Sequence, residues 1–283
     1  MKLYLDKTKT LDFSHHVHIM GILNVTPDSF SDGGQYTVKG NILSHVQKMI
    51  DAGADIIDVG GESTRPFAEP VAEKEELRRV IPAIQAIRQH TTIPISIDTT
   101  KSAVAAQALQ AGANIINDIS ALRFDPRMID IVNEFKAPII IMHMQGTPSD
   151  MQINPEYNDI IAETLAFFHE RINWLEEAGV SRNKIIIDPG IGFGKTVAHN
   201  LLILNRAREY SSLGVPVLIG HSRKSFIGKV LSNDSSDRDI ATAVISGMLT
   251  DKHISILRVH DVQKTHEAIL INQAITTASE ATV

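Results

Sequence analysis

The chain has 283 residues, a formal net charge of −6 and 43% hydrophobic residues. This length is sufficient for one large α/β domain with a substantial core, and the mild acidity argues against a nucleic-acid surface. There is no cysteine, which excludes disulfides and thiolate zinc sites. Because the start of the chain lacks a signal-like apolar segment and no apolar run reaches about 18 residues, we expect a cytoplasmic protein that has no membrane partner.

Eight short apolar runs recur along the chain, and a longer segment with helical periodicity follows each of them. Continuous Ile- and Val-rich runs are typical of parallel strands that are buried on both faces. The expected strands are Ile19–Val25, Ile56–Val59, Ile93–Ile97, Ile115–Ile119, Pro138–Met142, Lys184–Ile187, Val215–Ile219 and Ile254–Val259. The expected helices are Ile42–Ala52, Glu73–Gln89, Ser102–Ala111, Pro126–Phe135, Ile160–Ala178, Ala198–Arg208, Asp237–Thr250 and Val262–Thr277.

This alternation predicts an α/β fold of the (β/α)8 TIM-barrel type, formed by a single domain over residues 1–283. Three segments, DAGADIIDVGG, QAGANIINDIS and EAGVSRNKIIIDPG, repeat the same joint between a helix and the next strand. A doubly wound open sheet is the alternative, since eight such units do not exclude it. Residues before about position 18 are expected to form a short strand or hairpin that caps the barrel bottom.

Polar side chains follow almost every expected strand, at the end of a barrel where active sites lie. They are Asn24, Asp58, Asp98, Asn117 or Asp118, His143, Asp188, Ser222 with Arg223 and Lys224, and Arg258 with His260. Any one of them is explained as a helix cap or a turn residue. A full ring of polar groups around one mouth indicates a bound ligand, because buried polar groups need partners.

Asp98, Asn117 and Asp188 form the first chemical subset of this ring. Two carboxylates and an amide match the N–H-rich edge of a planar heterocycle. The same residue types also serve as paired acid–base carboxylates or as metal ligands, and spacing does not choose among these uses.

The second subset is basic and follows the last two expected strands, where barrels often hold a phosphate group. Its members are Lys224, Arg258 and His260, and Arg65 lies on the second loop. Asn24 and Asp32 offer hard oxygen atoms on the first loop. Basic groups that face hard oxygens indicate a diphosphate with Mg²⁺.

The stretch IMGILNVTPDSFSDGG begins as a strand and continues as a loop after Asn24. Thr26-Pro27 and Gly33-Gly34 are typical turn and hinge residues. These features fit an ordinary surface loop after a core strand or a lid that carries Phe30 and Asp32 over the site.

The segment Gly190–Thr196, GIGFGKT, resembles a phosphate-binding loop. The Walker spacing requires glycine where this chain has Pro189, and the dinucleotide fingerprint requires one at Lys195, so ATP and NAD are excluded. We expect the glycines to let the backbone approach a ligand and to place Phe193 in the mouth.

The 12 histidines include no pair with the spacing of a zinc site. His15, His16 and His18 lie near the expected barrel bottom. They are interpreted as surface residues.

Five motifs resemble those of the bacterial dihydropteroate synthase family. IMGILNVTPDSFSDGG and GADIIDVGGESTRP resemble its two signatures, and IDPGIGFGK, SRKSFIG and RVHD resemble its later motifs in the same order. The resemblance covers essentially the whole chain. It implies a cytoplasmic (β/α)8 barrel, usually a homodimer, that joins (7,8-dihydropterin-6-yl)methyl diphosphate to 4-aminobenzoate. The products are 7,8-dihydropteroate and diphosphate, the reaction uses Mg²⁺, and it belongs to tetrahydrofolate biosynthesis, the target of sulfonamides.

The resemblance also implies roles for individual residues. The pterin would be bound by Asp98, Asn117, Met142, Asp188 and Lys224. The diphosphate would meet Asn24, Thr64, Arg258 and His260, with the metal near Asn24. 4-Aminobenzoate would lie among Phe30, Arg65, Pro66, Phe193 and Ser225. The catalytic residues would be Asp98, Asp32 and Lys224, and Asp98 would stabilise positive charge on the pterin methylene in a largely dissociative substitution.

Two residues depart from the family pattern. Phe67 follows Arg65-Pro66 where a small residue is common, and His221 precedes Ser222 where a small or apolar one is expected. Both would lie near the aminobenzoate entrance and would affect the affinity for that substrate and its sulfonamide mimics.

Two rival functions share the pterin-binding residues. A corrinoid-dependent methyltransferase barrel does not require NVTPDSFSDGG, SRK or RVH, and all three are present. A non-catalytic pterin-binding paralogue is disfavoured by the presence of Asn24, Arg65, Lys224 and Arg258. Without the resemblance, the residues indicate a barrel that binds a phosphorylated metabolite.

Overall fold

The computed structural model describes residues 1–5, 9–14, 16–25, 35–63, 70–233 and 237–278, and it gives only the backbone for 35–39. Eight parallel strands form its main sheet in the order β8-β7-β6-β5-β4-β3-β10-β9. They are β3 (His18–Asn24), β4 (Ile56–Gly60), β5 (Ile95–Asp98), β6 (Ile115–Asp118), β7 (Ile139–Met142), β8 (Ile185–Asp188), β9 (Leu218–Ile219) and β10 (Ile256–Val259). A parallel bridge between Ile187 and Val217 joins the two edges. The sheet therefore closes, which confirms the (β/α)8 barrel and rules out the open doubly wound sheet.

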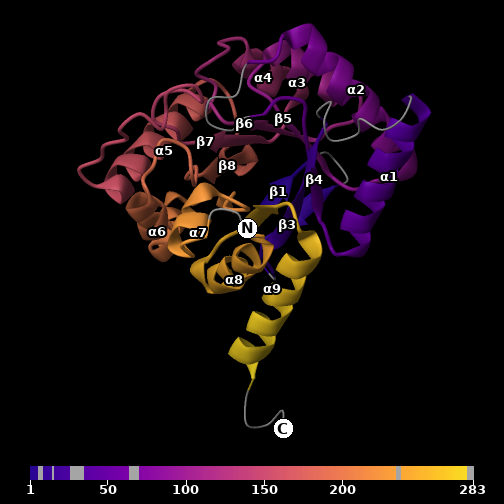
Figure 1. Cartoon of the computed structure of the whole chain (residues 1–283). Helices are drawn as coiled ribbons and strands as arrows, with labels where there is room; N and C mark the ends of the chain where they lie inside the picture. Colours follow the sequence, from indigo (N-terminus) through magenta and orange to yellow (C-terminus); the bar gives the residue numbers. More distant parts are fainter. Residues whose placement is uncertain (6–8, 15, 26–34, 64–69, 234–236, 279–283) are drawn as a thin grey trace.

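Helices surround the strands as a ring (Figure 1). They are α1 (Gln35–Asp51), α2 (Glu73–His90), α3 (Ser102–Gln110), α4 (Met128–Phe135), α5 (Ile160–Glu177), α6 (Val197–Asn205), α7 (Ser225–Val230), α8 (Asp239–Leu249) and α9 (Val262–Thr277), with short 3₁₀ segments η2 (Arg182–Lys184), η3 (Ala207–Leu213) and η4 (Thr250–Lys252). Helix α1 begins seven residues before the expected Ile42, because Gly40 and its β-branched neighbours give that stretch a low helix propensity in isolation. Helix α7 was not among the helices expected from periodicity, because six residues are too few to show one.

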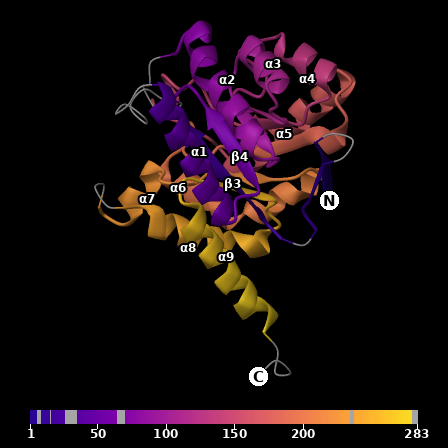
Figure 2. The same ribbon diagram turned by 90° about the vertical axis from the view of Figure 1, so that its right-hand side faces the viewer.

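The N-terminal segment closes one end of the barrel, as predicted. Strands β1 (Lys2–Tyr4) and β2 (Thr10–Asp12) pair antiparallel. Their apolar side chains form one cluster with inward-facing residues of the barrel strands: Leu3, Leu5, Leu11, Met20, Ile56, Ile115, Ile140, Ile186, Leu218 and Ile256. Figure 2 shows the N-terminus and α7 on opposite sides of the barrel. The open end, where α7 lies, is therefore the one left for a substrate.

The outer faces of the strands pack against the helices and form the larger core. Ile57, Ile97 and Ile139 belong to this cluster together with Val80 of α2 and Phe168 of α5. Burial on both faces explains why the strand sequences do not alternate between apolar and polar residues. Within the described ranges, no helix is both long and apolar enough to cross a membrane.

The expectation that His18 is a surface residue is wrong. Its side chain opens β3 and is 5% exposed, because the ring of Phe13 packs edge-on against it with centroids 5.0 Å apart. His16 is exposed as expected, and His15 lies outside the described residues.

Candidate active site

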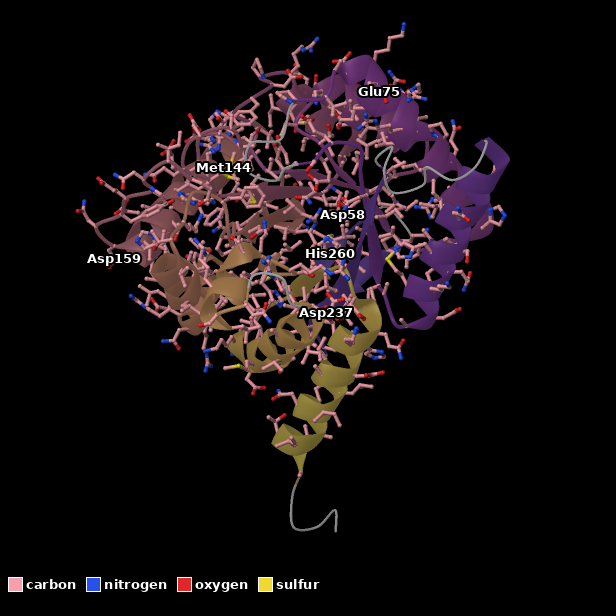
Figure 3. All side chains as sticks on the ribbon, viewed as in Figure 1. Asp58, Glu75, Met144, Asp159, Asp237 and His260 are labelled. Carbon is pink, nitrogen blue, oxygen red and sulfur yellow. The ribbon has the colours of Figure 1, made fainter. Side chains whose placement is uncertain are left out.

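Four side chains from the C-terminal ends of the strands join in one hydrogen-bonded group, the Arg258 cluster, formed by Arg258, Asp58, Asp98 and Asn117. Arg258 donates from Nε to Asp58 Oδ2 (2.6 Å) and from Nη2 to Asp98 Oδ2 (2.6 Å). Asn117 Nδ2 also donates to Asp58 Oδ2, at 3.2 Å. Figure 3 places Asp58 near the middle of the molecule, close to His260, whereas Glu75 and Asp159 lie at its periphery. The cluster unites two residues of the predicted pterin set with one of the predicted diphosphate set.

Asp58 was noted among the strand ends, but no role was assigned to it. The strand register shows that it lies one layer below Asp98 and Asn117, since Asp58 pairs with Ser96 whereas Asp98 pairs with Gly60 and with Asn117. Its side chain is 0% exposed. The buried carboxylate of Asp58 therefore orients the side chains of Arg258 and Asn117.

The structure also decides between Asn117 and Asp118. The carboxylate of Asp118 accepts the N–H groups of Ser120 (2.7 Å) and Leu122 (3.0 Å) in the following loop. Neighbouring residues of a strand point to opposite sides, so Asn117 faces the barrel interior. Asn117 is the residue available to a ligand.

Burial and charge determine the ionisation of this cluster. Burial raises the pKa of Asp98 to about 7, with Arg258 opposing the shift and Asp58 adding to it. Burial disfavours the charged form of Arg258, but Asp58 and Asp98 outweigh it and raise the pKa of the guanidinium. Arg258 is thus fully charged at neutral pH, whereas Asp98 is near the midpoint of its titration.

Lys224 and Asp188 lie on the other side of the mouth, next to Phe193. The Lys224 ammonium lies 3.9 Å from the centroid of the Phe193 ring, and burial lowers the pKa of Lys224 to about 8. Asp188 Oδ1 accepts the N–H of Gly190 at 2.8 Å, and burial raises the pKa of Asp188 to about 6. A ligand that touches Lys224 would therefore also lie close to Phe193.

An apolar surface adjoins these charged groups. Met142 and Phe193 belong to a separate cluster of buried side chains, which also contains Ile119, Met144 and Met151. It offers a planar ligand a face to pack on, while the carboxylates hydrogen-bond its edge.

Two glycines after β8 pack closely against other parts of the chain. A Cβ at Gly190 would lie 2.0 Å from His143 O, and one at Gly192 would lie 2.9 Å from Lys224 Cδ. Both glycines have positive φ, at +73° and +81°. The close approaches seen here are to the protein's own chain, and the expected approach of this backbone to a ligand stays a prediction.

The side chain of Lys195 hydrogen-bonds the backbone of the loop that carries Phe193. Its buried ammonium donates to Phe193 O at 2.9 Å and to His143 O at 3.2 Å, and it contacts His143 Nδ1 at 3.1 Å. Burial lowers the pKa of Lys195 to about 7. Lys195 thus fixes Phe193 and does not point outward to bind phosphate, which agrees with the exclusion of ATP.

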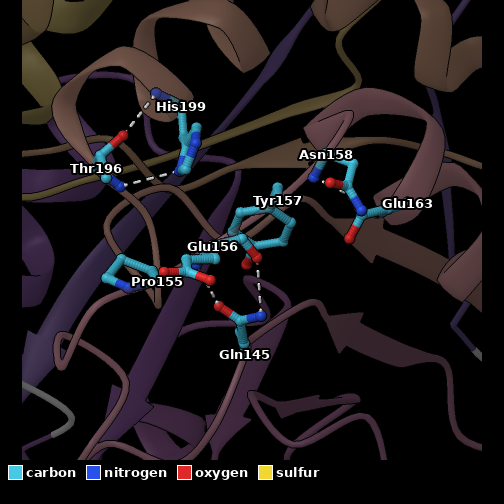
Figure 4. Close-up of a pocket in the computed structure, with 8 residues that line it drawn as sticks. All are labelled: Gln145, Pro155, Glu156, Tyr157, Asn158, Glu163, Thr196 and His199. Atoms are coloured by element: carbon cyan, nitrogen blue, oxygen red, sulfur yellow. Dashed lines mark hydrogen bonds between the residues drawn. The ribbon is translucent and has the colours of Figure 1, made fainter.

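A pocket of ≈ 700 Å³ lies on the rim, between the segment after β7 and the start of α6 (Figure 4). Gln145 donates to Glu156 O (3.1 Å) and accepts from Glu156 N (3.2 Å). Tyr157 on its wall donates to Gly194 O at 2.8 Å. No predicted site residue lines this pocket. Its wall therefore supports the loop that carries Phe193, through the hydrogen bond from Tyr157 to Gly194.

On the basic side, His260 is held by Ser222. Ser222 Oγ accepts the backbone N–H of His260 at 3.1 Å and lies 2.9 Å from His260 Nδ1. Ser225 is exposed and opens α7 directly after Lys224. Arg258 Nη1 has no hydrogen-bond partner among the described residues. One N–H edge of this guanidinium is thus available to an anion.

The donors at the end of β3 fit Mg²⁺. Asn24 is exposed, and its Oδ1 lies 3.8 Å from where a Cβ at Gly60 would lie, as does Asp98 Oδ2. Mg²⁺ in enzymes takes one or two protein oxygens and completes its octahedron with water and substrate phosphate. Asn24, beside the mouth, meets that requirement.

The remaining predicted residues, Phe30, Asp32, Thr64, Arg65 and Pro66, lie outside the described residues, as do Phe67 and the predicted lid. Their roles stay predictions.

His221 does not lie at an entrance, so its expected place is wrong. It is 0% exposed, because the residue turns away from the mouth and packs against α8. There His221 Nε2 lies 3.1 Å from both Thr242 O and Ser246 Oγ. Its Nδ1 has no partner in the part of the chain that the structure describes.

We expect a His221→Met variant to gain stability over the parent chain as the pH falls from 6.5 toward 4. Burial lowers the pKa of His221 from 6.5 to about 4. In that window the unfolded chain binds a proton at this histidine and the folded chain does not, so acid removes stability from the parent only. Urea unfolding at pH 7 and pH 4.5 should show the difference in unfolding free energy widening by roughly 2–3 kcal/mol. A difference that does not change with pH, or one that widens equally for exposed His169→Met, would contradict this origin.

Comparison with known proteins identifies the family. Residues 20–260 match the model of the pterin binding enzyme family. Dihydropteroate synthase of Escherichia coli (strain K12) is 46% identical over 99% of this chain and 98% of its own length. The crystal structure of the Yersinia pestis dihydropteroate synthase with a sulfonamide drug has a TM-score of 0.91 at 42% identity and covers 98% of this chain and 100% of that one. The Xanthomonas albilineans enzyme with 4-aminobenzoic acid has a TM-score of 0.87 at 40% identity, covering 95% and 96%. The chain belongs to the pterin binding enzymes and, within them, to the dihydropteroate synthase family.

Proposed function

We propose that this protein condenses (7,8-dihydropterin-6-yl)methyl diphosphate with 4-aminobenzoate to give 7,8-dihydropteroate and diphosphate. The supporting observation is the Arg258 cluster, which joins carboxylate and amide acceptors for a pterin to a guanidinium for a diphosphate. The curated relative from Escherichia coli carries this activity in its name, and the Xanthomonas albilineans relative was solved with 4-aminobenzoic acid. Sulfonamides should compete at the aminobenzoate site.

The pterin is bound by groups on both sides of the mouth. Asp98, Asn117 and Asp188 face its N–H and carbonyl edge, and Lys224 donates a hydrogen bond from Nζ. Met142 packs on its face.

The diphosphate is directed to the basic side. Arg258 Nη1 and His260 meet its oxygens, and Thr64 belongs to the same predicted set. Asn24 would hold Mg²⁺, which when bound would neutralise charge on the leaving diphosphate. Asp98 Oδ2 remains bonded to Arg258 Nη2, so one guanidinium connects the leaving group to the carboxylate that faces the pterin.

The substitution breaks the methylene C–O bond and forms a C–N bond. The electron pair leaves with diphosphate, and the carboxylate of Asp98 stabilises the positive charge that develops on the pterin methylene. The arylamine of 4-aminobenzoate, placed beside Phe193 and Ser225, attacks this centre and then loses a proton to diphosphate or water. Phe30, Asp32, Arg65 and Pro66 are proposed to complete the aminobenzoate and diphosphate sites.

The deciding experiment supplies the purified protein with the pterin diphosphate, 4-aminobenzoate and Mg²⁺. We expect equal amounts of dihydropteroate and diphosphate, with product loss when any one component is omitted. Pterin binding without diphosphate release would instead support a non-catalytic paralogue. Methyl transfer from a methylated folate would support the corrinoid-dependent methyltransferase.

We further propose that the protein is a single-domain cytoplasmic homodimer that pairs through α8 and α9. Ile240, Val244 and Met248 repeat at intervals of four on an exposed face of α8, and Ile271 and Ile275 are exposed on α9. Exposed apolar side chains gathered on neighbouring helices are typical of an interface. Sedimentation equilibrium should give twice the chain mass, and Val244→Glu should yield a monomer; a monomeric parent chain would refute the pairing.

A further inference from the structure

Three metal-ligating side chains lie together at the N-terminal end of the barrel, opposite the candidate active site. They belong to His16, His18 and Asp55, and one nitrogen or oxygen atom of each lies within 4.8 Å of the others. Within the described residues, no other group of three His, Cys, Asp or Glu side chains is as compact. None of them takes part in the proposed reaction.

The barrel fixes two of the three ligands. The backbone N–H of His18 donates to Ser255 O at 2.9 Å, at the start of β3. Asp55 makes two hydrogen bonds to Ile19, the residue after His18. Its N–H donates to Ile19 O (2.9 Å), and its Oδ2 accepts the N–H of Ile19 (2.8 Å). Asp55 Oδ1 is left facing His16, whose Nε2 lies 3.9 Å away. This arrangement matches metal sites in which a hydrogen bond to one carboxylate oxygen orients the other.

His18 provides the second, independent observation. It is 5% exposed, and its buried Nδ1 has no hydrogen-bond partner among the described residues. The ring of His16 stacks on it, with centroids 4.5 Å apart and planes 17° apart. A buried ring nitrogen without a partner is costly, so such an atom indicates a missing ligand.

The spacing of the histidines in the sequence does not by itself reveal this group. His16 and His18 are two residues apart in sequence and their rings stack on one another, although no longer zinc motif is present. Asp55 joins them only because β4 lies next to β3.

We propose that His16, His18 and Asp55 bind one Zn²⁺ ion, with water as the fourth ligand. Two imidazole nitrogens and one carboxylate oxygen suit Zn²⁺, whereas Mg²⁺ prefers oxygen ligands only. Bonds of about 2.0–2.1 Å require the ligand atoms to approach to about 3.3 Å. The movement falls on the exposed His16 side chain. The bound ion would tie the segment before β3 to the turn before β4.

The test titrates chelator-treated full-length protein with Co²⁺ and follows the visible absorption of tetrahedral cobalt, with Zn²⁺ as competitor. Substrates and Mg²⁺ are omitted, so the diphosphate site does not contribute. We expect one equivalent to bind, Zn²⁺ to displace it, and Zn²⁺ to raise the melting temperature.

Two single-histidine variants provide the contrast. His16→Ala removes an exposed ligand without disturbing the core and should weaken Co²⁺ binding by at least about tenfold and abolish the thermal shift. His169→Ala, which removes an exposed histidine of α5, should bind as the parent does. No tetrahedral spectrum in the parent, or equal binding by all three proteins, would overturn the proposal and leave His18 Nδ1 to a water molecule. The outcome is independent of turnover, so it stands apart from the proposed function.

Discussion

Asp98→Asn is expected to lower kcat by about 10²–10³-fold while the protein stays folded, because one preorganised charge at a developing cation contributes on that scale. The amide has nearly the shape of the carboxylate, and its oxygen still accepts from Arg258 Nη2, as Asp98 Oδ2 does at 2.6 Å. What the variant loses is the negative charge beside the pterin methylene. Steady-state kcat and both KM values would be measured together with the unfolding free energy.

Asp58→Asn is the matched control. It removes a carboxylate from the same guanidinium, at the same distance of 2.6 Å. Asp58 is fully buried and is not placed to touch a substrate. We expect Asp58→Asn mainly to lower the unfolding free energy and to lower kcat by less than about tenfold. Near-normal turnover of Asp98→Asn would remove Asp98 from the mechanism, and equal losses in both variants would assign the effect to the orientation of Arg258.

The pH profile provides a second readout of Asp98. With its pKa raised to about 7, the carboxylate becomes protonated below that pH and loses the charge that the reaction requires. The profile of kcat/KM for the pterin substrate reports the free enzyme, so it should fall below about pH 7 in the parent and not in Asp98→Asn. A raised carboxyl pKa means that protonation of this group stabilises the fold between its unfolded value of 3.8 and 7. The loss of rate on this limb is therefore not unfolding caused by Asp98.

The fold was predictable because its signals are local. The runs of Ile and Val around Ile57, Ile97 and Ile139 cannot alternate, since helices cover one face and the barrel interior the other. Such a run indicates a parallel strand before any contact is known. A prediction that depends on local signals fails where they are weak. Helix α7 and the first turns of α1 were not among the expected helices, because their local sequences carry a weak helical signal.

The residues of the site could be predicted as a set of strand ends, but their levels along the barrel and their contacts could not. Arg258 and Asp58 are 200 residues apart in sequence, and only the register shows that Asp58 lies one layer below Asp98. Likewise, nothing in the sequence shows that His221 turns toward Thr242 or that His18 is covered by Phe13. These are tertiary contacts, whereas the motifs specify only residue types and their order.

Arg258→Lys is expected to raise the KM for the pterin diphosphate by roughly 10–100-fold and to change the KM for 4-aminobenzoate far less, since a charge-assisted hydrogen bond contributes about 1.5–3 kcal/mol. Arg258 donates from Nε to Asp58 and from Nη2 to Asp98, which leaves Nη1 for the diphosphate. Lysine keeps the charge, but its single ammonium cannot bridge two carboxylates and still reach an anion. Steady-state kinetics with each substrate varied in turn would measure the two KM values.

Arg258→Ala should show the same selectivity, but it is the weaker test, because it leaves Asp58 and Asp98 buried without their cation. Removing one partner of a buried ion pair costs about 3–5 kcal/mol, so loss of folding would obscure loss of binding. Arg223→Lys is the matched control for the lysine variant. Arg223 makes a similar two-bond pair, with Asp239 at 2.6 and 2.7 Å, and its side chain is about half exposed. If Arg258→Lys weakens binding of both substrates equally, or if Arg223→Lys shows the same selective loss, the diphosphate does not bind at Arg258 Nη1. A selective loss confined to Arg258→Lys would place the diphosphate at Nη1, because this guanidinium alone connects the leaving group to Asp98.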